Sequence, residues 1–291
     1  MIELNHSPTQ VVKWSLAEQE SIRVDIKRDD LLHPVISGNK WRKLKYLLED
    51  AEQKQCQSVI SMGGNWSNHL HALAYAGHQL AIPTQGFVRA HSDQPLTPTL
   101  IDCKRWGMTL SFVTRKEYAE LREHRDWTAF QQRFPKSYWI GEGGFSQLAM
   151  RGVEEIGQEV DESYDYVFVG CGSGATLCGL AKAFPKSQVV GVAAFSGAEY
   201  LQEQLQASLT QKVDNWTIDT EHHCGGFAKS TAELNHLIES IEHENAFELD
   251  AVYNGKVFLA VEHWLQQGKL PRDSRVLVIH TGGLQGKREV N

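Results

Sequence analysis

The stretch Tyr166-Val167-Phe168-Val169-Gly170-Cys171-Gly172-Ser173-Gly174-Ala175-Thr176 decides the fold class of this chain. Its first half is a short apolar run that ends at glycines, and it predicts a buried β-strand. The glycines then allow a tight turn into a helix, and strand, turn and helix in this order are typical of α/β folds. Free backbone N–H groups at the helix start, together with the hydroxyl groups of Ser173 and Thr176, can bind a phosphate.

The same alternation continues on both sides of this stretch. We expect strands at 58–62, 81–88, 109–113, 137–140, 166–170, 188–195 and 275–280. We expect helices at 67–78, 98–106, 116–134, 146–159, from the glycine run to about 184, and at 199–209, 230–245 and 256–267. Such a series implies parallel sheets with right-handed crossovers. The glycine-rich run at 141–144 is the expected crossing between two sheets.

The composition narrows the class of protein. A chain of 291 residues with 41% hydrophobic and 22% charged residues is typical of a soluble protein of about two domains. A net charge of −7 argues against nucleic acid as a partner. No apolar run approaches the roughly 18 residues of a membrane span, and the N-terminus lacks the basic and apolar regions of a signal peptide. We therefore expect a cytoplasmic location and no membrane partner.

The cysteines and histidines do not indicate a metal site. The 5 cysteines are odd in number and form no Cys-x-x-Cys pair. The 13 histidines show no His-Glu-x-x-His spacing. We expect neither a metal ion nor a disulfide framework.

The segment Ser37-Gly38-Asn39-Lys40-Trp41-Arg42-Lys43-Leu44-Lys45 predicts the start of a helix. Ser37 or Asn39 can cap this helix, and its apolar stripe continues through Leu44 and Leu47. The first two turns hold four cations, which oppose the helix dipole: Lys40, Arg42, Lys43 and Lys45. One interpretation is a solvated basic face. The other is that one lysine points inward and is used covalently.

Three further segments follow predicted strands or precede predicted helices. Gly63-Gly64-Asn65-Trp66-Ser67-Asn68-His69 opens a helix, where free N–H groups suit a carboxylate. The run Asp250-Ala251-Val252-Tyr253-Asn254-Gly255-Lys256 offers a phenol and an amide. The run His280-Thr281-Gly282-Gly283 ends a buried strand, at the edge where open α/β sheets bind ligands. Each segment taken alone is also compatible with an ordinary loop.

The glycine run also matches the dinucleotide fingerprint Gly-x-Gly-x-x-Ala through Gly170, Gly172 and Ala175. That fingerprint requires an acidic residue about 20 positions on, at the end of the next strand. No acid precedes Glu199 there. The sequence therefore favours a monophosphate over NAD, and a Rossmann-type oxidoreductase remains the alternative.

Five segments together resemble the family of 1-aminocyclopropane-1-carboxylate deaminases and D-cysteine desulfhydrases, which are pyridoxal-phosphate enzymes. The matching segments, in chain order, are Ser37-Gly38-Asn39-Lys40-x-Arg42-Lys43-Leu44, Gly63-Gly64-x-x-Ser67-Asn68-His69, the glycine run at 170–176, Asp250-x-Val252-Tyr253-x-Gly255-Lys256 and His280-Thr281-Gly282-Gly283. Their order and spacing match over nearly the whole chain. Any single segment is a weak signal, whereas five in sequence are specific.

The resemblance implies a two-domain α/β fold of type II, similar to the tryptophan synthase β-subunit, with a mostly parallel twisted sheet flanked by helices in each domain. The large domain that binds pyridoxal 5′-phosphate would comprise residues 1–43 and 144–291, and the small domain residues 44–143. A homodimer that acts on a small amino acid is typical of this family.

The resemblance also implies roles for individual residues. Lys40 would be the Schiff-base lysine and, once released, a general base. Asn68 would bond the ring hydroxyl of the cofactor, and Thr281 would face its pyridine nitrogen. The phosphate would be held by Gly172, Ser173, Gly174, Ala175 and Thr176. The substrate and its proton transfers would be served by Ser67, Asn68, His69, Tyr253 and Asn254, with Ser67 and Tyr253 as catalytic groups.

One departure from the family bears on the reaction. Cyclopropane deaminases carry a glutamate directly after the tyrosine of the Val-Tyr motif, and this chain has Asn254 there. A neutral amide cannot supply the charge of a carboxylate. This favours α,β-elimination on D-cysteine, which gives pyruvate, ammonia and sulfide, over cyclopropane ring opening to 2-oxobutyrate and ammonia. A non-catalytic amino-acid-binding relative remains a further alternative.

Overall fold

The computed structural model describes residues 2–36, 38–123, 132–209 and 213–288, and these residues contain two β-sheets. The larger sheet has the strand order β1-β2-β10-β7-β8-β9. Its pairs are parallel except for β1 with β2. The strands are β1 (Thr9–Val11), β2 (Arg23–Lys27), β7 (Tyr166–Cys171), β8 (Gln188–Ala193), β9 (Trp216–Asp219) and β10 (Arg275–Ile279).

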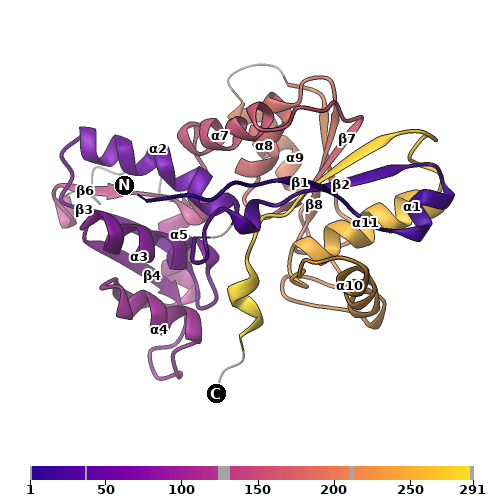
Figure 1. The fold of residues 1–291 in the computed structure, drawn as a ribbon. Helices are drawn as coiled ribbons and strands as arrows, with labels where there is room; N and C mark the ends of the chain where they lie inside the picture. The colour runs from indigo at the N-terminus through magenta and orange to yellow at the C-terminus, as the bar shows by residue number, and fades with distance from the viewer. Residues whose placement is uncertain (1, 37, 124–131, 210–212, 289–291) are drawn as a thin grey trace.

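The smaller sheet has the order β5-β4-β3-β6, and all of its pairs are parallel. Its strands are β3 (Ser58–Gly64), β4 (Thr84–Arg89), β5 (Thr109–Val113) and β6 (Ser137–Trp139). Figure 1 shows the two sheets in separate halves of the molecule. The C-terminal 3₁₀ helix η4 (Leu284–Lys287) lies between these halves.

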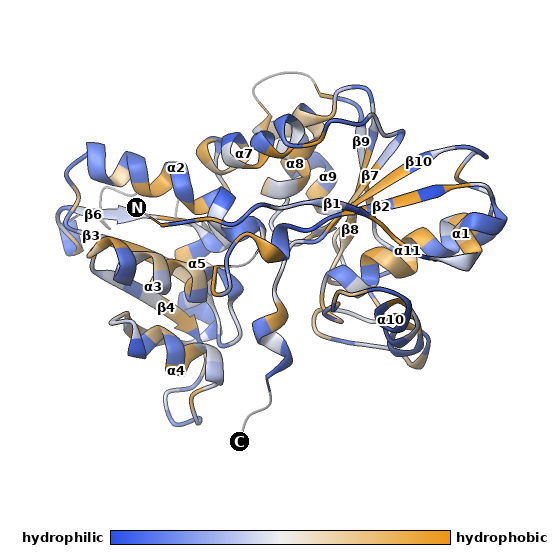
Figure 2. Cartoon of the chain, viewed as in Figure 1, coloured by the Kyte–Doolittle hydropathy of each residue, from blue (hydrophilic) through white to orange (hydrophobic). Residues whose placement is uncertain are grey.

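Helices cover both faces of the larger sheet because its strands send alternate side chains to opposite faces. Phe168 packs in a core with the helices α1 (Ser15–Gln19), α10 (Ala232–Glu244) and α11 (Asn254–Gln266). Its neighbours Val167 and Val169 pack in the opposite core with α7 (Gln147–Glu154), α8 (Ala175–Ala183) and α9 (Tyr200–Ser208). Figure 2 shows the hydrophobic residues concentrated in these strands.

The smaller sheet is covered in the same way. Val59 of β3 faces a core shared with α2 (Asn39–Gln53), α3 (Asn68–Leu80) and α4 (Pro98–Arg105). The next residue, Ile60, faces a second core with Tyr118 of α5 (Arg115–Glu123). The predicted helix at 116–134 corresponds in its first part to α5, and its residues 124–131 lie outside the described part of the chain.

Between β2 and β7 the chain crosses from the larger-sheet half to the smaller-sheet half and back. It leaves β2 through the 3₁₀ helix η1 (Asp29–Leu31) and enters α2. It returns through η2 (Glu142–Gly144) and α7, which confirms the crossing expected at 141–144. The helices α2 and α7 pack closely, because a Cβ on Gly152 would lie 1.8 Å from the carbonyl oxygen of Arg42. Among the described residues, no helix is both long and apolar enough to cross a bilayer.

The strands expected from apolar runs are all present, whereas β1, β2 and β9 were not expected. The sequence of β2, Arg23-Val24-Asp25-Ile26-Lys27, alternates charged and apolar residues and so resembles a solvent-exposed strand. In the structure Asp25 is fully buried and accepts a hydrogen bond of 2.7 Å from Tyr164. This hydrogen bond, with ion pairs to Arg23 at 3.0 Å and Arg275 at 3.9 Å, lets Asp25 lie in an inner strand.

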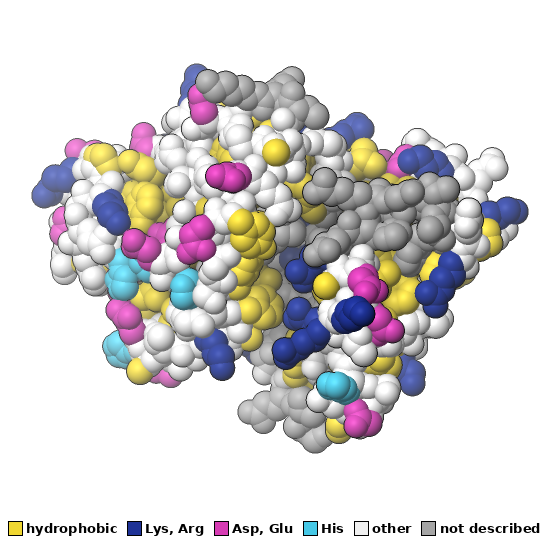
Figure 3. All heavy atoms as spheres, turned by 180° about the vertical axis from the view of Figure 1, so that it is seen from behind, with side chains coloured by type: hydrophobic (Ala, Val, Ile, Leu, Met, Phe, Trp, Pro, Cys, Tyr) yellow, Lys and Arg dark blue, Asp and Glu magenta, His cyan; other side chains and the backbone are white. Residues whose placement is uncertain are grey.

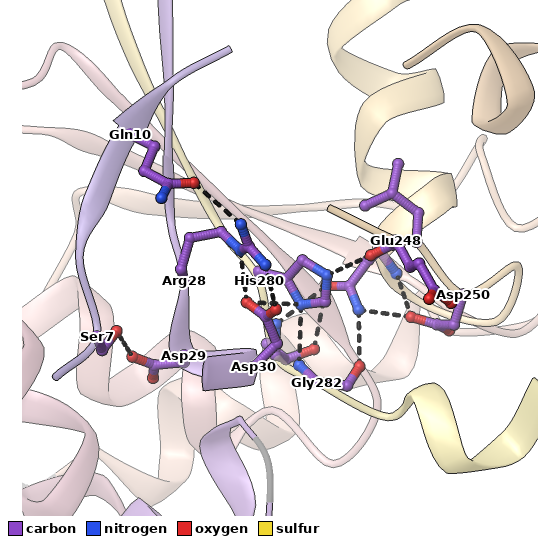
Figure 4. A network of polar contacts seen from close by, with 12 residues as sticks. Ser7, Gln10, Arg28, Asp29, Asp30, Glu248, Asp250, His280 and Gly282 are labelled. Atoms are coloured by element: carbon purple, nitrogen blue, oxygen red, sulfur yellow. Dashed lines mark hydrogen bonds and ion pairs between the residues drawn. The ribbon is translucent and has the colours of Figure 1, made fainter. Parts of the chain in front are cut away.

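A buried ionic network joins the two halves at the start of α2. Arg42 donates hydrogen bonds to Asp29 at 2.6 and 2.7 Å and to Glu159 at 2.8 Å. Lys27 also pairs with Glu159, at 2.8 Å. Figure 4 shows Ser7 bonded to the Asp29 carboxylate. Burial would lower the pKa of Arg42, but its two carboxylate partners raise it.

The interpretation of this segment as a solvated basic face is therefore wrong. Arg42 and Lys43 are both buried. Lys45 forms an ion pair with Glu155 at 2.7 Å. The cations that oppose the dipole of α2 are compensated by carboxylates from other elements, except for Lys40 and Lys43, to which no carboxylate is bonded among the described residues.

Glu159→Gln tests the network. The change is expected to lower the free energy of unfolding at neutral pH by about 1–2 kcal/mol, the low end for bonds to charged groups, because the carboxylate is 38% exposed. Burial would raise the pKa of Glu159, but bonds from Arg42 and Lys27 lower it from 4.5 to about 2. Its stabilisation is therefore present above pH 4.5 and is lost as the pH falls towards 2.

Urea unfolding at neutral pH and at several values below pH 4.5 measures this window. The wild type should lose stability more steeply than Glu159→Gln. Glu154→Gln removes the partner of Lys182 in a pair whose carboxylate is 36% exposed, and this control should keep the wild-type slope. Equal slopes for the wild type and Glu159→Gln would contradict the role of the network.

Candidate functional site

The start of α2 lies directly against the end of β10. Gly38 has φ 70°, and a Cβ there would lie 1.8 Å from the carbonyl oxygen of Thr281. Only glycine fits this position, because both the positive φ and the close approach exclude a side chain. Gly38 is also the N-cap of α2, so the expected cap by Asn39 is wrong, and Ser37 lies outside the described residues.

The side chain of Asn39 points across to the glycine run instead. Its Nδ2 donates a hydrogen bond of 2.8 Å to Oγ1 of Thr176, in the first turn of α8. Both residues are buried. The bond therefore brings the lysine segment to residues 172–176, although more than 130 positions separate them in the chain.

Lys40 is half-buried at this junction, and its Nζ donates to the side-chain oxygen of Asn39. Burial lowers the pKa of Lys40 to about 7, and the charge of Lys43 adds to this effect while Asp250 opposes it. An amine with such a pKa is substantially neutral at physiological pH. Lys40 can therefore act as a nucleophile or as a general base.

The glycine run has an unused polar group. Oγ of Ser173 is buried and has no hydrogen-bond partner among the described residues. Gly174, with φ 85°, is the N-cap of α8, so the free N–H groups of that helix start beside Ser173. A Cβ on Gly143 would lie 3.0 Å from Oγ of Ser173, so the crossing segment η2 approaches the same loop.

Tyr253 covers the backbone of the glycine run. A Cβ on Gly170 would lie 3.0 Å from Cβ of Tyr253, and one on Gly172 would lie 3.3 Å from its Oη. Burial raises the pKa of the Tyr253 phenol, and the negative charge of Asp250 raises it further. The phenol therefore keeps its proton and can donate it.

Asn254 is fully buried and holds the loop after β10. Its Nδ2 donates to Asp250 and, at 2.8 Å, to the carbonyl of Gly282, while its Oδ1 accepts from the N–H of Thr281 at 3.0 Å. Figure 4 shows Asp250 and Gly282 at the two ends of this network. The side-chain amide of Asn254 therefore forms hydrogen bonds with other residues of the protein.

The loop after β3 brings its residues to the same region. Oγ of Ser67 accepts from the N–H of Leu70 at 3.2 Å and so caps α3. Asn68 accepts a hydrogen bond from Gln285, and a Cβ on Gly283 would lie 2.9 Å from its Nδ2. Ser67 and Asn68 therefore lie close to the segment that follows Thr281.

His69 is buried beside the two uncompensated lysines. Its Nε2 contacts Oγ of Ser61 at 2.9 Å, and its Nδ1 has no partner among the described residues. Burial lowers the pKa of His69 to about 3, and the charges of Lys43 and Lys40 contribute. This imidazole is therefore neutral at physiological pH.

The candidate site residues thus converge from loops at the carboxyl ends of β3, β7 and β10, where open α/β sheets bind ligands. Figure 3, from behind, shows hydrophobic side chains next to Lys and Arg side chains where the two halves meet. The contributions of Asn39 and Lys43 were not predicted. Nothing in their spacing distinguishes them from a polar cap and a surface cation, and only their long-range contacts reveal them.

Comparisons with known proteins agree with this arrangement. Residues 2–282 match the family described as "Pyridoxal-phosphate dependent enzyme". The mitochondrial bifunctional D-cysteine desulfhydrase/1-aminocyclopropane-1-carboxylate deaminase of Arabidopsis thaliana is 27% identical, over 97% of this chain and 78% of its own length. The D-cysteine desulfhydrase of Serratia proteamaculans is 25% identical, over 97% of this chain and 93% of its own.

A solved structure of an ACC deaminase homologue superposes with a TM-score of 0.81 at 27% identity, and it covers 99% of this chain and 92% of its own. The fold expected from the sequence is therefore confirmed. The match over nearly the whole length means that this chain belongs to the family of pyridoxal-phosphate-dependent enzymes, with pyridoxal phosphate as its cofactor.

Proposed function

We propose that the protein is a lyase that performs α,β-elimination on D-cysteine and releases pyruvate, ammonia and sulfide, with Lys40 as the amine that holds the cofactor. One observation carries the proposal. The amine of Lys40, with a pKa of about 7, sits beside Asn39, which bonds to Thr176 of the glycine run. The names of the Arabidopsis and Serratia relatives support the choice of substrate.

The residues present fit the cofactor. A phosphate needs several hydrogen-bond donors, and the run from Gly172 to Thr176 offers the free N–H groups of α8 and the unpartnered hydroxyl of Ser173. Lys40 lies at the same junction and supplies the amine. We propose that Asn68 and Thr281 meet the ring of the cofactor, because both lie on loops that contact this junction.

Pyridoxal phosphate, when bound, draws electron density from the bonds of the substrate α-carbon. The protein supplies the proton transfers. We propose that Nζ of Lys40 moves the α-proton, since its lowered pKa lets it accept and return a proton near pH 7. Tyr253, which stays protonated, is a candidate donor to the leaving group.

The substrate carboxylate would bind at the start of α3, where free N–H groups follow Ser67. Asn68 and His69 lie in the first turn of the same helix, and His69 carries no net charge at neutral pH. We propose this helix start as the carboxylate site.

Asn254 favours elimination over ring opening. A glutamate in its place could not donate to Asp250 and Gly282, and its charge would face the Asp250 carboxylate. We propose that Asn254 serves the substrate site through Thr281, whose N–H it binds. Ring opening of the cyclopropane acid remains the second candidate, because relatives carry that name.

We also propose a large domain of residues 1–43 with 144–291, a small domain of residues 44–143, a cytoplasmic location and a homodimer. The separation into two sheets supports the domain division. The membership of the pyridoxal-phosphate family disfavours a Rossmann oxidoreductase.

The substrate assignment predicts a specific product pattern. In a panel of D- and L-amino acids plus 1-aminocyclopropane-1-carboxylate, the wild type should release sulfide and pyruvate from D-cysteine. The products are measured as sulfide, pyruvate and 2-oxobutyrate. Turnover of the cyclopropane acid alone would favour the second candidate, and turnover of none would favour a non-catalytic relative.

The cofactor assignment predicts a coloured protein. The purified protein should show the visible absorbance of bound pyridoxal phosphate, and Lys40→Ala should abolish both this band and turnover. Lys45 lies on the same helix and pairs with Glu155, so Lys45→Ala serves as the matched control and should keep the band. An unchanged band in Lys40→Ala would contradict the assignment.

The lowered pKa of Lys40 predicts unusual reactivity in cofactor-free protein. At pH 7 about half of this amine is neutral, against roughly 1 in 3,000 for an ordinary lysine. Pulse labelling with an amine reagent, read by peptide mass spectrometry, should modify Lys40 with a midpoint near pH 7. Lys45 is the control, because its bond to Glu155 raises its pKa in spite of burial. Labelling of Lys40 only above pH 9 would contradict the prediction.

A further inference from the structure

The segment Glu221–Lys229, between β9 and α10, has a strained backbone. Positive φ values occur at Cys224 (54°), Gly225 (86°), Gly226 (136°) and Ala228 (55°). Two of these residues carry side chains, which disfavour this conformation. Such strain persists only where the surroundings hold it, and it is common at functional sites.

Two anchors hold this segment. At its beginning, the Asp219 carboxylate accepts hydrogen bonds from the N–H groups of Glu221 and His222, at 3.0 and 3.2 Å. In its middle, Nζ of Lys256 donates to the carbonyl of Gly226 at 2.9 Å and to that of Ala194 at 3.0 Å.

Lys256 is fully buried, and no carboxylate is bonded to its amine in the described part of the chain. A buried amine held only by backbone carbonyls is costly, because it loses its hydration without a charged partner. Through these two bonds, Lys256 links the segment Glu221–Lys229 to the loop after β8. Its two hydrogen bonds hold the backbone of Gly226, and with it Phe227, in place.

Phe227 directly follows Gly226, whose carbonyl Lys256 holds. Its side chain is 55% exposed, although it follows a tightly held residue. Its ring lies 6.0 Å from the ring of Tyr253 at an interplanar angle of 75°. Because Tyr253 covers Gly170 and Gly172, Phe227 stands at the rim of the candidate site.

We propose that Phe227 is a specificity-determining residue, which contacts the substituent on the substrate β-carbon and selects sulfur over oxygen there, and that Lys256 is the residue that positions it. This inference rests on the proposed function. The ring of a phenylalanine offers a hydroxyl group only a weak contact with its π face. It does attract a polarizable sulfur atom, often at its edge.

Ligand binding to the pyridoxal-phosphate holoenzyme tests the inference when it is followed by rapid mixing, before the ligand is turned over. The probes are S-methylcysteine and O-methylserine, an isosteric pair that differs only in sulfur and oxygen, in both enantiomers. Dissociation constants are read from the change in visible absorbance. The wild type should prefer the sulfur ligand, and Phe227→Ala should reduce this preference by about 2- to 10-fold while its cofactor band is unchanged.

Tyr200→Ala removes an aromatic residue that is also 55% exposed, and this control should keep the wild-type ratio. Lys256→Met should reproduce the loss of Phe227→Ala. If Lys256→Met fails to fold, Phe227→Ala alone decides. An unchanged ratio in Phe227→Ala, or no preference in the wild type, would overturn the inference.

The proposed function fails by a different result. If both ligands bind but D-cysteine yields no sulfide and no pyruvate, elimination is rejected while the role of Phe227 is still measured. If neither ligand changes the absorbance in either enantiomer, both proposals are rejected.

Discussion

The hydrogen bond between Asn39 and Thr176 is the contact on which the candidate site depends. It ties the start of α2, which leads into the smaller sheet, to the start of α8, which packs on the larger one. Gly38 packs on the backbone of Thr281 beside it, so three loops meet within a few residues. Without this junction, Lys40 would belong to one half of the molecule and the glycine run to the other.

The electrostatics of α2 separate two of its lysines from the neighbouring cations. Arg42 and Lys45 have carboxylate partners, which raise their pKa. Lys40 and Lys43 have none bonded to them in the described residues, and burial lowers the pKa of both, to about 7 and about 8. A run of four similar cations is thus divided by distant parts of the fold into paired charges and amines of lowered pKa.

The buried lysine Lys256 is a useful contrast to Lys40. Burial lowers its pKa too, but two carbonyl groups occupy its amine. Within the described residues, the amine of Lys40 is bonded only to the side chain next to it, so it is free to exchange that partner. Low pKa alone therefore does not mark a reactive lysine, and the surrounding acceptors decide which of the two can react.

The sequence by itself determined the α/β class, the apolar inner strands and the five family motifs, because periodicity, glycine turns and motif spacing are local properties of the chain. Even the crossing at 141–144 followed from its glycines. The tertiary structure alone decided that the charged strand β2 is buried, that Gly38 rather than Asn39 caps α2, and that Phe227 faces Tyr253. Each of these depends on groups more than 25 positions away, namely Tyr164, Thr176 and Tyr253. Burial and charge compensation arise only when such distant groups meet, so no local pattern records them.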